Sequence, residues 1–538
     1  MSIFTSGAPV HYIPVSSGTR LQSAPSQERA IGTKIVRNAI SGVLRLVLLA
    51  PIPFLLTPFL LRHLGTTGFG IWAVLLSLNG LTALADLGVV GTLTKHVSEH
   101  YTQRDYAKLN RVMNAGILVF SVIAMVCVLG VSAASGFLVS VFFRQSLLPV
   151  LQLQHAIRLL SVAFALNLLA FPFASVISGL QRLDLTNLLW GLNATITALA
   201  AVVFVELGKG IPGLVHALVL TSGILFLLNV SLAWHLLPQL RIRPGLVRFA
   251  DVKALSAFSL KVYVVQVAST VYFQTEKLLL AHFAGPTSVG WYEIGNDLAL
   301  KIRNAPALLM TPLMPAAAEL EARGDEARTA ELYYRTHKYL AVIGIAMFTV
   351  VALLAHRFID LWLGPGFSAT ARALIVLTGV QTAHLAAGPA LLILVGRGNL
   401  GPAVRFALVG MTGTLILSTV FISLWGFTGA LYGTSVSVLS ATAYLILMFH
   451  QETSFSRLRL VRIYIQPMVL ALCLFVLADY LVPVRRLHWP GMIATAVALP
   501  VVDGVGLLLL RYFDAFDLRI VERLLPVPEV VRRSWLFP

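Results

Sequence analysis

Polar side chains recur at helical spacing within three otherwise apolar stretches of the chain. Residues three, four or seven positions apart share one face of a helix, so each set would form a polar stripe along that helix. The three stripes are Asn79, Thr82 and Asp86; Gln266, Thr270, Gln274 and Lys277; and Glu293, Asp297, Lys301 and Asn304. At membrane depth such groups are expected to face an interior cavity or each other.

From these stripes we predict a substrate-binding cavity. Its predicted members are Arg45, Asn79, Asp86, Gln266, Thr270, Gln274 and Lys277. Arg45 and Lys277 are the candidates to face an anion, because a cationic head can bind phosphate. Asn79, Gln266 and Gln274 are candidates for neutral hydrogen bonds to a ligand, and the resemblance to a transporter family given below implies that they contact sugar. No residue is assigned a catalytic role, and no metal or other cofactor is expected.

A second set of residues has two interpretations. It consists of Asp86, Glu276, Glu293, Asp297 and Lys301. Carboxylates at membrane depth often bind a coupling proton or cation, which predicts coupling to H⁺, to Na⁺ or to the membrane potential. The alternative is that these residues only pair with each other, for example Asp297 with Lys301 one helical turn away.

The elements that carry these residues are predicted to be membrane-spanning helices. The chain is 57% hydrophobic and 12% charged, about half the charge of an average soluble domain. A helix needs about 20 mostly apolar residues to cross a bilayer. Fourteen spans are predicted, at 38–61, 69–92, 112–136, 157–179, 186–206, 211–236, 258–283, 287–315, 339–356, 373–395, 401–425, 428–450, 463–483 and 490–510.

Lysine and arginine residues collect on one side of these spans. They lie mainly in the N-terminal segment, in alternate connections and in the C-terminal tail. By the positive-inside rule, both termini are predicted to be cytoplasmic. Topology therefore explains the net charge of +17, and no nucleic-acid partner is expected. The sequence predicts a multi-pass membrane protein, and the family resemblance given below implies the bacterial inner membrane.

Short motifs return along the chain at nearly constant intervals. The segment from Gly65 to Trp72 returns as Gly285 to Tyr292. The segment 181–185 is echoed by 396–400, and 210–214 by 426–430. Spans 1–6 and 7–12 are therefore predicted to be two copies of one six-helix unit, related by a pseudo-twofold axis along the membrane normal. Transporters with parallel repeats place the substrate site between the two halves.

The predicted fold is all-α, with two six-helix lobes and two additional C-terminal helices. The expected units are a flexible cytoplasmic segment 1–37, a first lobe 38–236, a cytoplasmic linker 237–257, a second lobe 258–450, two further spans within 463–510 and a cytoplasmic tail 511–538.

Several motifs in this order resemble one transporter family. They are Leu64-Gly65, Phe69-Gly70-Ile-Trp72, Ala85-Asp86-Leu-Gly88, Glu276-Lys277-Leu-Leu-Leu, Val289-Gly290-Trp-Tyr292 and Pro315-Ala-Ala-Ala-Glu-Leu320. Together they are similar to the polysaccharide transporter branch of the multidrug/oligosaccharidyl-lipid/polysaccharide exporter superfamily, over roughly residues 34–450.

This resemblance implies a flippase without enzymatic activity. The family's two lobes form a V around a cavity lined largely by spans 1, 2, 7 and 8. The cavity opens alternately to each side and moves a polyprenyl-pyrophosphate-linked oligosaccharide for O-antigen, capsule or exopolysaccharide assembly. In fourteen-span relatives, the last two spans imply a groove for the polyprenyl tail. The implied partners are this lipid-linked glycan, membrane lipid and other polysaccharide-assembly proteins.

Three other functions compete with this expectation. The first is a cation-coupled multidrug exporter of the same superfamily. The second is a membrane glycosyltransferase or polymerase, which would need a large outward loop with catalytic residues, whereas the longest outward connection, 137–156, holds Arg144 as its one fixed charge. The third is a membrane scaffold for glycan assembly without transport. The metal-like pattern at His96, Glu99 and His100 lacks a surrounding catalytic domain, so we do not assign a metal to it.

Overall fold

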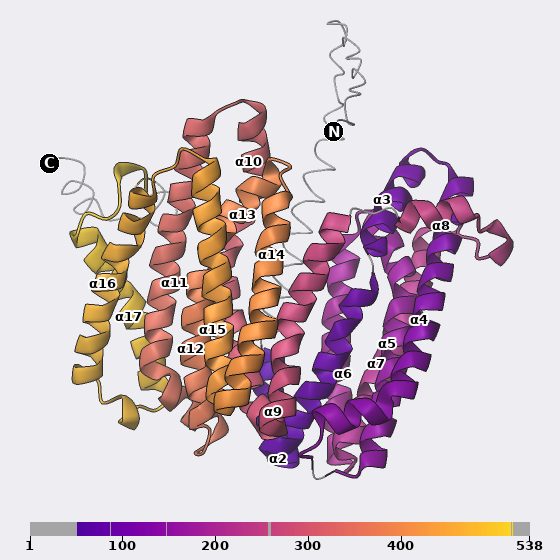
Figure 1. The fold of residues 1–538 in the computed structure, drawn as a ribbon, viewed down its shortest axis with the longest axis horizontal. Helices are drawn as coiled ribbons and strands as arrows, with labels where there is room; N and C mark the ends of the chain where they lie inside the picture. The colour runs from indigo at the N-terminus through magenta and orange to yellow at the C-terminus, as the bar shows by residue number, and fades with distance from the viewer. Residues whose placement is uncertain (1–50, 87, 147, 257–259, 518, 520–538) are drawn as a thin grey trace, which may run out of the picture.

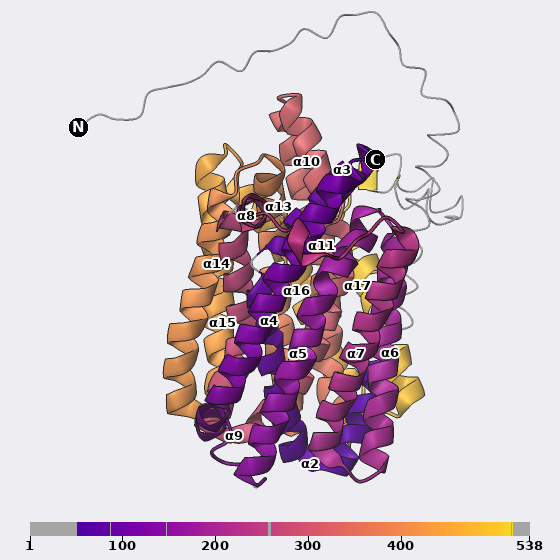
Figure 2. The same cartoon turned by 90° about the vertical axis from the view of Figure 1, so that its right-hand side faces the viewer.

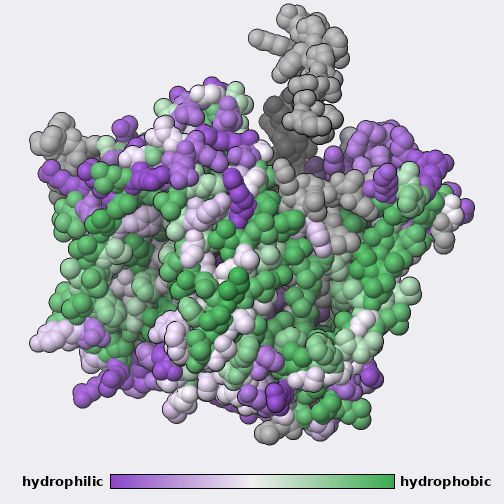
Figure 3. Space-filling model, viewed as in Figure 1, coloured by the Kyte–Doolittle hydropathy of each residue, from purple (hydrophilic) through white to green (hydrophobic). Residues whose placement is uncertain are grey.

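The structure is a computed structural model that describes residues 51–517 and 519, apart from residues 87, 147 and 257–259. Every regular element in this part of the chain is a helix, and the helices run side by side between two ends (Figure 1, Figure 2). A hydrophobic belt covers the visible face between two hydrophilic rims (Figure 3). The predicted all-α fold of a polytopic membrane protein is therefore confirmed.

The helices form two lobes and a C-terminal pair. The N-lobe contains α2 (Pro51–Gly80), η1 (Leu81–Asp86), α3 (Val89–Thr102), α4 (Tyr106–Phe142), α5 (Val150–Gly179), α6 (Leu183–Glu206) and α7 (Gly210–Leu236). The linker holds η2 (Pro244–Leu246) and α8 (Phe249–Ser256). The C-lobe contains α9 (Leu260–Ala307), η3 (Leu308–Met310), α10 (Leu313–Ala322), α11 (Glu326–Leu363), α12 (Ser368–His384), α13 (Ala387–Gly396), α14 (Gly401–Gly413), the π-helical η4 (Thr414–Ser418) and α15 (Thr419–Glu452). The pair is α16 (Arg457–Leu481) and α17 (Trp489–Leu509), with η5 (Val484–Arg486) between them.

Ten helical stretches in the described chain are long and apolar enough to cross a membrane. The stretches 51–86 and 401–452 each combine two predicted spans, which are separated by a glycine with non-helical backbone angles, Gly65 in α2 and Gly426 in α15. The long helix α9, which Gly285 interrupts in the same way, is not among the ten, although two spans are predicted there. Most of the first predicted span lies outside the described residues, so the number of fourteen crossings remains a prediction.

The two lobes contact each other through equivalent residues of the internal repeat. The hydroxyls of Thr67 and Thr287, which are 220 positions apart, are 2.8 Å from each other. A Cβ atom on Gly70 would lie 1.7 Å from the carbonyl oxygen of Pro286, and one on Gly290 would lie 2.9 Å from that of Thr66. Equivalent residues of the two copies therefore touch, which places the pseudo-twofold axis between them. We call this the glycine contact; it lies where α2 and α9 meet (Figure 1).

Local backbone geometry repeats at the same interval. Arg104 and Gly324 both have a positive φ, at 57° and 65°. The residues that follow them, Asp105 and Asp325, cap α4 and α11 by accepting a hydrogen bond from a backbone N–H three residues on. The turn after α5 corresponds to a slightly different position from the one we predicted. We paired Gln181 with Gly396, but the residue of the C-lobe that shares its positive φ is Gly398. The predicted pseudo-twofold repeat is confirmed with this small correction in register.

Further hydrogen bonds join the lobes on either side of the glycine contact. Trp362 Nε1 donates to the carbonyl oxygen of Phe54 at 2.9 Å, and His282 Nδ1 lies 2.8 Å from that of Val141. Farther along α9, Tyr263 donates to the carbonyl oxygen of Leu84 at 3.0 Å. We call the surface where α2 and η1 meet α9 the lobe seam.

Two asparagines on α4 bind the start of the linker. Asn110 donates to the carbonyl oxygen of Gln239 and accepts from the N–H of Arg241. One turn on, Asn114 donates to the carbonyl oxygen of Arg241 and accepts from the N–H of Arg243. Both side chains therefore pair with the linker main chain much as a neighbouring strand would, and they hold it against the N-lobe.

We predict that Gly70→Ala weakens the lobe contact. The new methyl group would collide with backbone rather than with a flexible side chain, so overpacking should cost about 1–3 kcal/mol. The measurement is the disulfide yield between Thr67→Cys and Thr287→Cys in a background with Cys127→Ser and Cys473→Ser, together with thermal unfolding in detergent. Gly130→Ala is the control, since its Cβ would meet nothing within 4 Å. Equal disulfide yields in the two variants would contradict the glycine contact.

Candidate functional site

Lys277 and Glu293 form an ion pair within α9, across the Gly285 interruption. Lys277 Nζ lies 3.1 Å from one carboxylate oxygen and 3.2 Å from the other. The side chains are 10% and 21% exposed, so little water compensates either charge. Lys277, which we predicted to face an anion, is neutralised by Glu293 in this conformation. The pair joins two stripes that sequence spacing treated as separate.

Asp297 and Lys301 also pair, one turn farther along the same helix. This is the i, i+4 ion pair that we considered as the alternative to ion coupling. Both side chains are close to half exposed. Such a pair contributes about 0–1 kcal/mol, so it tells little about function.

The polar stripes of α2 and α9 meet at the lobe seam. A Cβ on Gly80 would lie 2.4 Å from the amide nitrogen of Gln274, so this side chain packs directly on the backbone of the other lobe. The oxygens of Gln274 and of Asn79 are both buried without a hydrogen-bond partner among the described residues. Buried acceptors without donors are costly, so this part of the seam is suited to a ligand that supplies hydroxyl groups.

The other predicted cavity residues are more dispersed. Thr270 is buried and Gln266 is exposed. Asp86 accepts a hydrogen bond of 3.0 Å from the N–H of Val90, so it binds the first turn of α3, whose N-cap is Gly88. Arg45 lies outside the described residues.

Glu276 occupies a small polar pocket inside the C-lobe. Its side chain is 4% exposed, and neither carboxylate oxygen has a hydrogen-bond partner or a cation in the described chain. The pocket has a volume of about 20 Å³ and is lined by Tyr272, Phe273, Glu276, Tyr292, Asn296, Gln381, Thr414 and Thr434. This volume is about that of one water-sized probe, so a proton, a water molecule or a small cation fits, and a sugar does not.

Most residues of the Glu276 pocket were missed from the sequence. Gln381, Thr414 and Thr434 lie on α12, η4 and α15, where single polar residues in apolar helices give no periodic signal. Thr414 and Ser418 are the ends of the π-helical turn η4, and their hydroxyls are buried without partners. π-helical turns frequently occur at functional sites, but nothing in the sequence marks this one.

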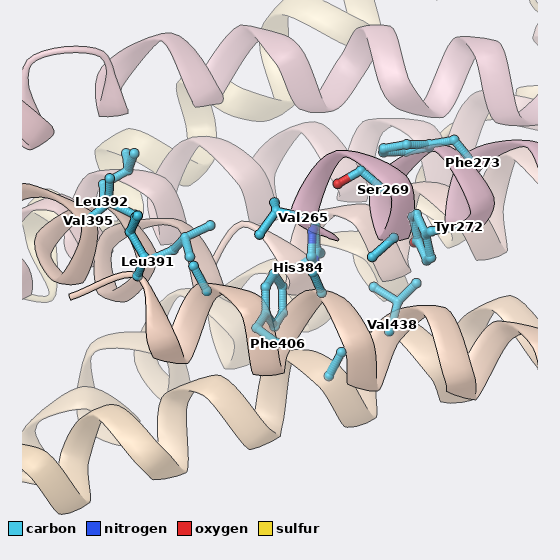
Figure 4. Close-up of a pocket in the computed structure, with 16 residues that line it drawn as sticks. Val265, Ser269, Tyr272, Phe273, His384, Leu391, Leu392, Val395, Phe406 and Val438 are labelled. Carbon is cyan, nitrogen blue, oxygen red and sulfur yellow. The ribbon is translucent and has the colours of Figure 1, made fainter. Parts of the chain in front are cut away.

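An apolar cavity of about 400 Å³ adjoins this pocket (Figure 4). The two share Tyr272 and Phe273. The cavity's polar groups include His384, which stacks on Phe406 and lies 3.0 Å from the hydroxyl of Thr442. No Lys, Arg, Asp or Glu lines it, so it can hold an apolar group and cannot by itself bind phosphate.

Comparison with known proteins points to one family. The model of the family described as "Polysaccharide biosynthesis protein" matches residues 35–321, just over half of the chain. A putative O-antigen transporter of Shigella flexneri is 19% identical over 264 residues, which is 49% of this chain and 62% of that protein, less than two thirds of its length. A probable low-salt glycan biosynthesis flippase of Haloferax volcanii is 22% identical over 428 residues, 78% of this chain and 84% of that protein.

The chain is similar in fold to two solved transporter structures. A lipid II flippase in an inward closed conformation aligns with a TM-score of 0.68 at 13% identity, over 87% of this chain and 98% of that one. An inward-facing multidrug resistance transporter of the MOP superfamily aligns with a TM-score of 0.58 at 14% identity, over 76% of this chain and 97% of that one. At these identities the likeness concerns the fold alone.

We predict that Lys277→Ala destabilises the protein more than the double variant Lys277→Ala/Glu293→Ala does. The single variant leaves a largely buried carboxylate unpaired, which costs about 3–5 kcal/mol, whereas the double variant removes both charges. Lys301→Ala should change stability by less than about 1 kcal/mol. Thermal unfolding in detergent measures all three. A single variant as stable as the double one would show that the ion pair is solvated.

Proposed function

The chain belongs to the polysaccharide biosynthesis protein family, and from this premise we propose that it translocates a lipid-linked oligosaccharide across the bacterial inner membrane. The proposed substrate is a glycan on a polyprenyl diphosphate, used in O-antigen, capsule or exopolysaccharide assembly. The observation that carries the proposal is the meeting of the α2 and α9 stripes at the lobe seam, inside the hydrophobic belt. Translocation makes and breaks no covalent bond, so no catalytic residue is assigned.

The proposed mechanism is alternating access by the two lobes. The glycine contact joins them at one end of the seam, and polar, partly unpaired side chains follow it along α2 and α9. We assign the basic end, which carries α3, α8 and α10, to the cytoplasm. On this assignment the glycine contact is the periplasmic closure, and the glycan enters between the lobes from the cytoplasmic side.

The proposed role of Lys277 is to exchange partners. In the empty protein Glu293 holds its ammonium group within 3.2 Å. A diphosphate is a stronger anionic partner than one carboxylate, so it would displace Glu293 when the carrier lipid reaches the seam. Arg45 is proposed as the second cation, and Asn79 and Gln274 would then accept hydrogen bonds from sugar hydroxyls.

Glu276 is the proposed ion-coupling residue. Its pocket lies within the C-lobe and is too small for substrate, so occupation by a proton or Na⁺ would act through the packing of α9, α12, η4 and α15. Hydroxyl, amide and carboxylate oxygens are suitable ligands for such an ion.

A multidrug exporter is the second candidate. The apolar cavity beside the Glu276 pocket supports it, because a large apolar cation could fill the cavity and face the carboxylate. The polar residues of the seam would then have no ligand to bind, which is why we favour the glycan flippase.

We predict that Lys277→Gln/Glu293→Gln abolishes surface glycan while membrane levels of the protein stay normal. The two amides can still bond to each other, so packing is kept while the anion-binding charge is lost. Asp297→Asn/Lys301→Gln is the matched control and should retain glycan. Surface glycan is measured by glycan staining of cells that depend on this protein. Arg45→Gln should also abolish surface glycan, as Lys277→Gln/Glu293→Gln does. Full display with Lys277→Gln/Glu293→Gln would remove Lys277 from the mechanism.

We further predict that Glu276→Gln makes transport insensitive to imposed ion gradients. In liposomes, a gradient of H⁺ or Na⁺ should accelerate transport by the natural protein and leave the variant unchanged. Asp503 in α17 offers a control, because its carboxylate is also buried without a partner among the described residues. Asp503→Asn should keep the gradient response. A response that survives Glu276→Gln would contradict the assignment.

A further inference from the structure

We infer that the N-lobe carries a binding groove for the polyprenyl chain of the carrier lipid, an inference that rests on the proposed function. The groove lies between η1, α4 and α5 and has a volume of about 460 Å³. Leu81, Leu84, Ile123, Ile157 and Phe164 are among its lining residues. No Lys, Arg, Asp or Glu is among the described residues that line it, and their chemistry suits a hydrocarbon. We call it the N-groove.

The repeat builds this groove a second time in the C-lobe. An apolar groove of about 490 Å³ there is lined by α9, α11, α12 and α17, and we call it the C-groove. The linings correspond pairwise at the repeat interval: Leu78 to Leu298, Cys127 to Met347, Val131 to Val351, Leu138 to Phe358 and, with the register shift seen after α5, Ile157 to Leu374. The chain therefore holds two grooves of similar size and matching chemistry, one per lobe.

The two grooves differ in their outer wall. Trp489, Met492, Ile493, Ala496 and Pro500 of α17 close one side of the C-groove. The described residues that line the N-groove all belong to α2, η1, α4 and α5, so none of them provides an equivalent wall. A polyprenyl chain is longer than either groove, and both grooves are open on one side to a similar degree. The choice of the N-groove therefore rests on its position beside the lobe seam.

The N-groove also adjoins the polar part of the lobe seam. Asn79 lines the groove, and its neighbour Gly80 packs against Gln274 of α9. Leu84 lines it as well, and its carbonyl oxygen accepts the hydrogen bond from Tyr263 of the other lobe. A lipid with its tail in this groove would therefore have its head group at the seam, beside the residues assigned to the glycan.

The inner wall of the N-groove is less regular than its counterpart. Leu81–Asp86 form a 3₁₀ helix, whereas the equivalent stretch of α9 stays α-helical up to Ala307. A 3₁₀ stretch within a helix often marks a hinge, so this wall can adjust to a chain that slides past it. A cavity of 150 Å³ accepts benzene, so the N-groove has room for roughly three groups of isoprene size.

Cys127 reports on the N-groove without any change to its lining. In liposomes, the full chain with Cys473→Ser should be alkylated at Cys127 by a membrane-permeant maleimide. Undecaprenyl diphosphate at about ten times its Kd fills about nine-tenths of the sites. Only about one-tenth of the protein then has a free thiol, so alkylation should be about tenfold slower. The matched control is Met347→Cys with Cys127→Ser and Cys473→Ser, which places the thiol in the C-groove and should not be protected. Protection at Met347→Cys alone would overturn the inference.

A matched pair of substitutions provides the second test. Val131→Trp fills the N-groove and Val351→Trp fills the C-groove at the equivalent position. A polyprenyl diphosphate with a diazirine on its chain should label α4 or α5 in the natural protein and in Val351→Trp, and about tenfold less in Val131→Trp. Equal labelling of this groove by a diazirine phosphatidylglycerol, without competition by undecaprenyl diphosphate, would show a general lipid surface and overturn the inference. The Cys127 measurement needs no bulky residue and decides the matter if Val131→Trp does not fold.

Transport measurements separate this inference from the proposed function. If liposomes with the natural protein move no lipid-linked glycan but undecaprenyl diphosphate still protects Cys127, the proposed function fails and the groove stands. If transport proceeds while Cys127 is not protected and Val131→Trp transports normally, the groove fails and the function stands.

Discussion

A charge at membrane depth must find a partner, because hydrocarbon offers it no solvation. The described part of α9 follows this constraint closely. Lys277 is held by Glu293 and Asp297 by Lys301 within the helix, and Arg303 donates a hydrogen bond to Gln381 of α12. Glu276 differs, since it is buried among hydroxyl and amide groups without a cation among the described residues. It is therefore the residue to which we assign the proposed ion coupling.

The internal repeat gives this constraint its geometry. The two copies touch at Gly70 and Gly290, where only hydrogen atoms separate the backbones. Beyond this contact the copies have diverged. The C-lobe has acquired the Glu276 pocket and the covering helix α17, while the N-lobe has a 3₁₀ stretch where its partner remains α-helical. A symmetric scaffold with different chemistry in each half can bind a head group, a tail and an ion in three separate places.

The sequence predicted the architecture better than the site. Apolar spans and the returning Gly65 and Gly285 motifs were enough for an all-helical, two-lobed membrane protein. Helical spacing also anticipated the Asp297–Lys301 pair. The pairing of Lys277 with Glu293 could not be foreseen, since it depends on how the chain bends at Gly285. The hydrogen bond that Asp86 accepts from the N–H of Val90 was not foreseen either, and its place in the cavity stays a prediction. The Glu276 pocket is assembled from four segments, so no local pattern could indicate it.

The asparagine pair on α4 limits how far the lobes can travel. Asn110 and Asn114 hold the linker main chain from Gln239 to Arg243, so this stretch belongs mechanically to the N-lobe. Beyond Arg243 the described part of the linker contains η2 and α8 before α9 begins. In the proposed mechanism, such a short connection would allow the lobes to rock about the contact at Gly70 and Gly290 but not to separate widely. A bulky sugar would thus enter when the two lobes tilt relative to each other, while they stay in contact throughout.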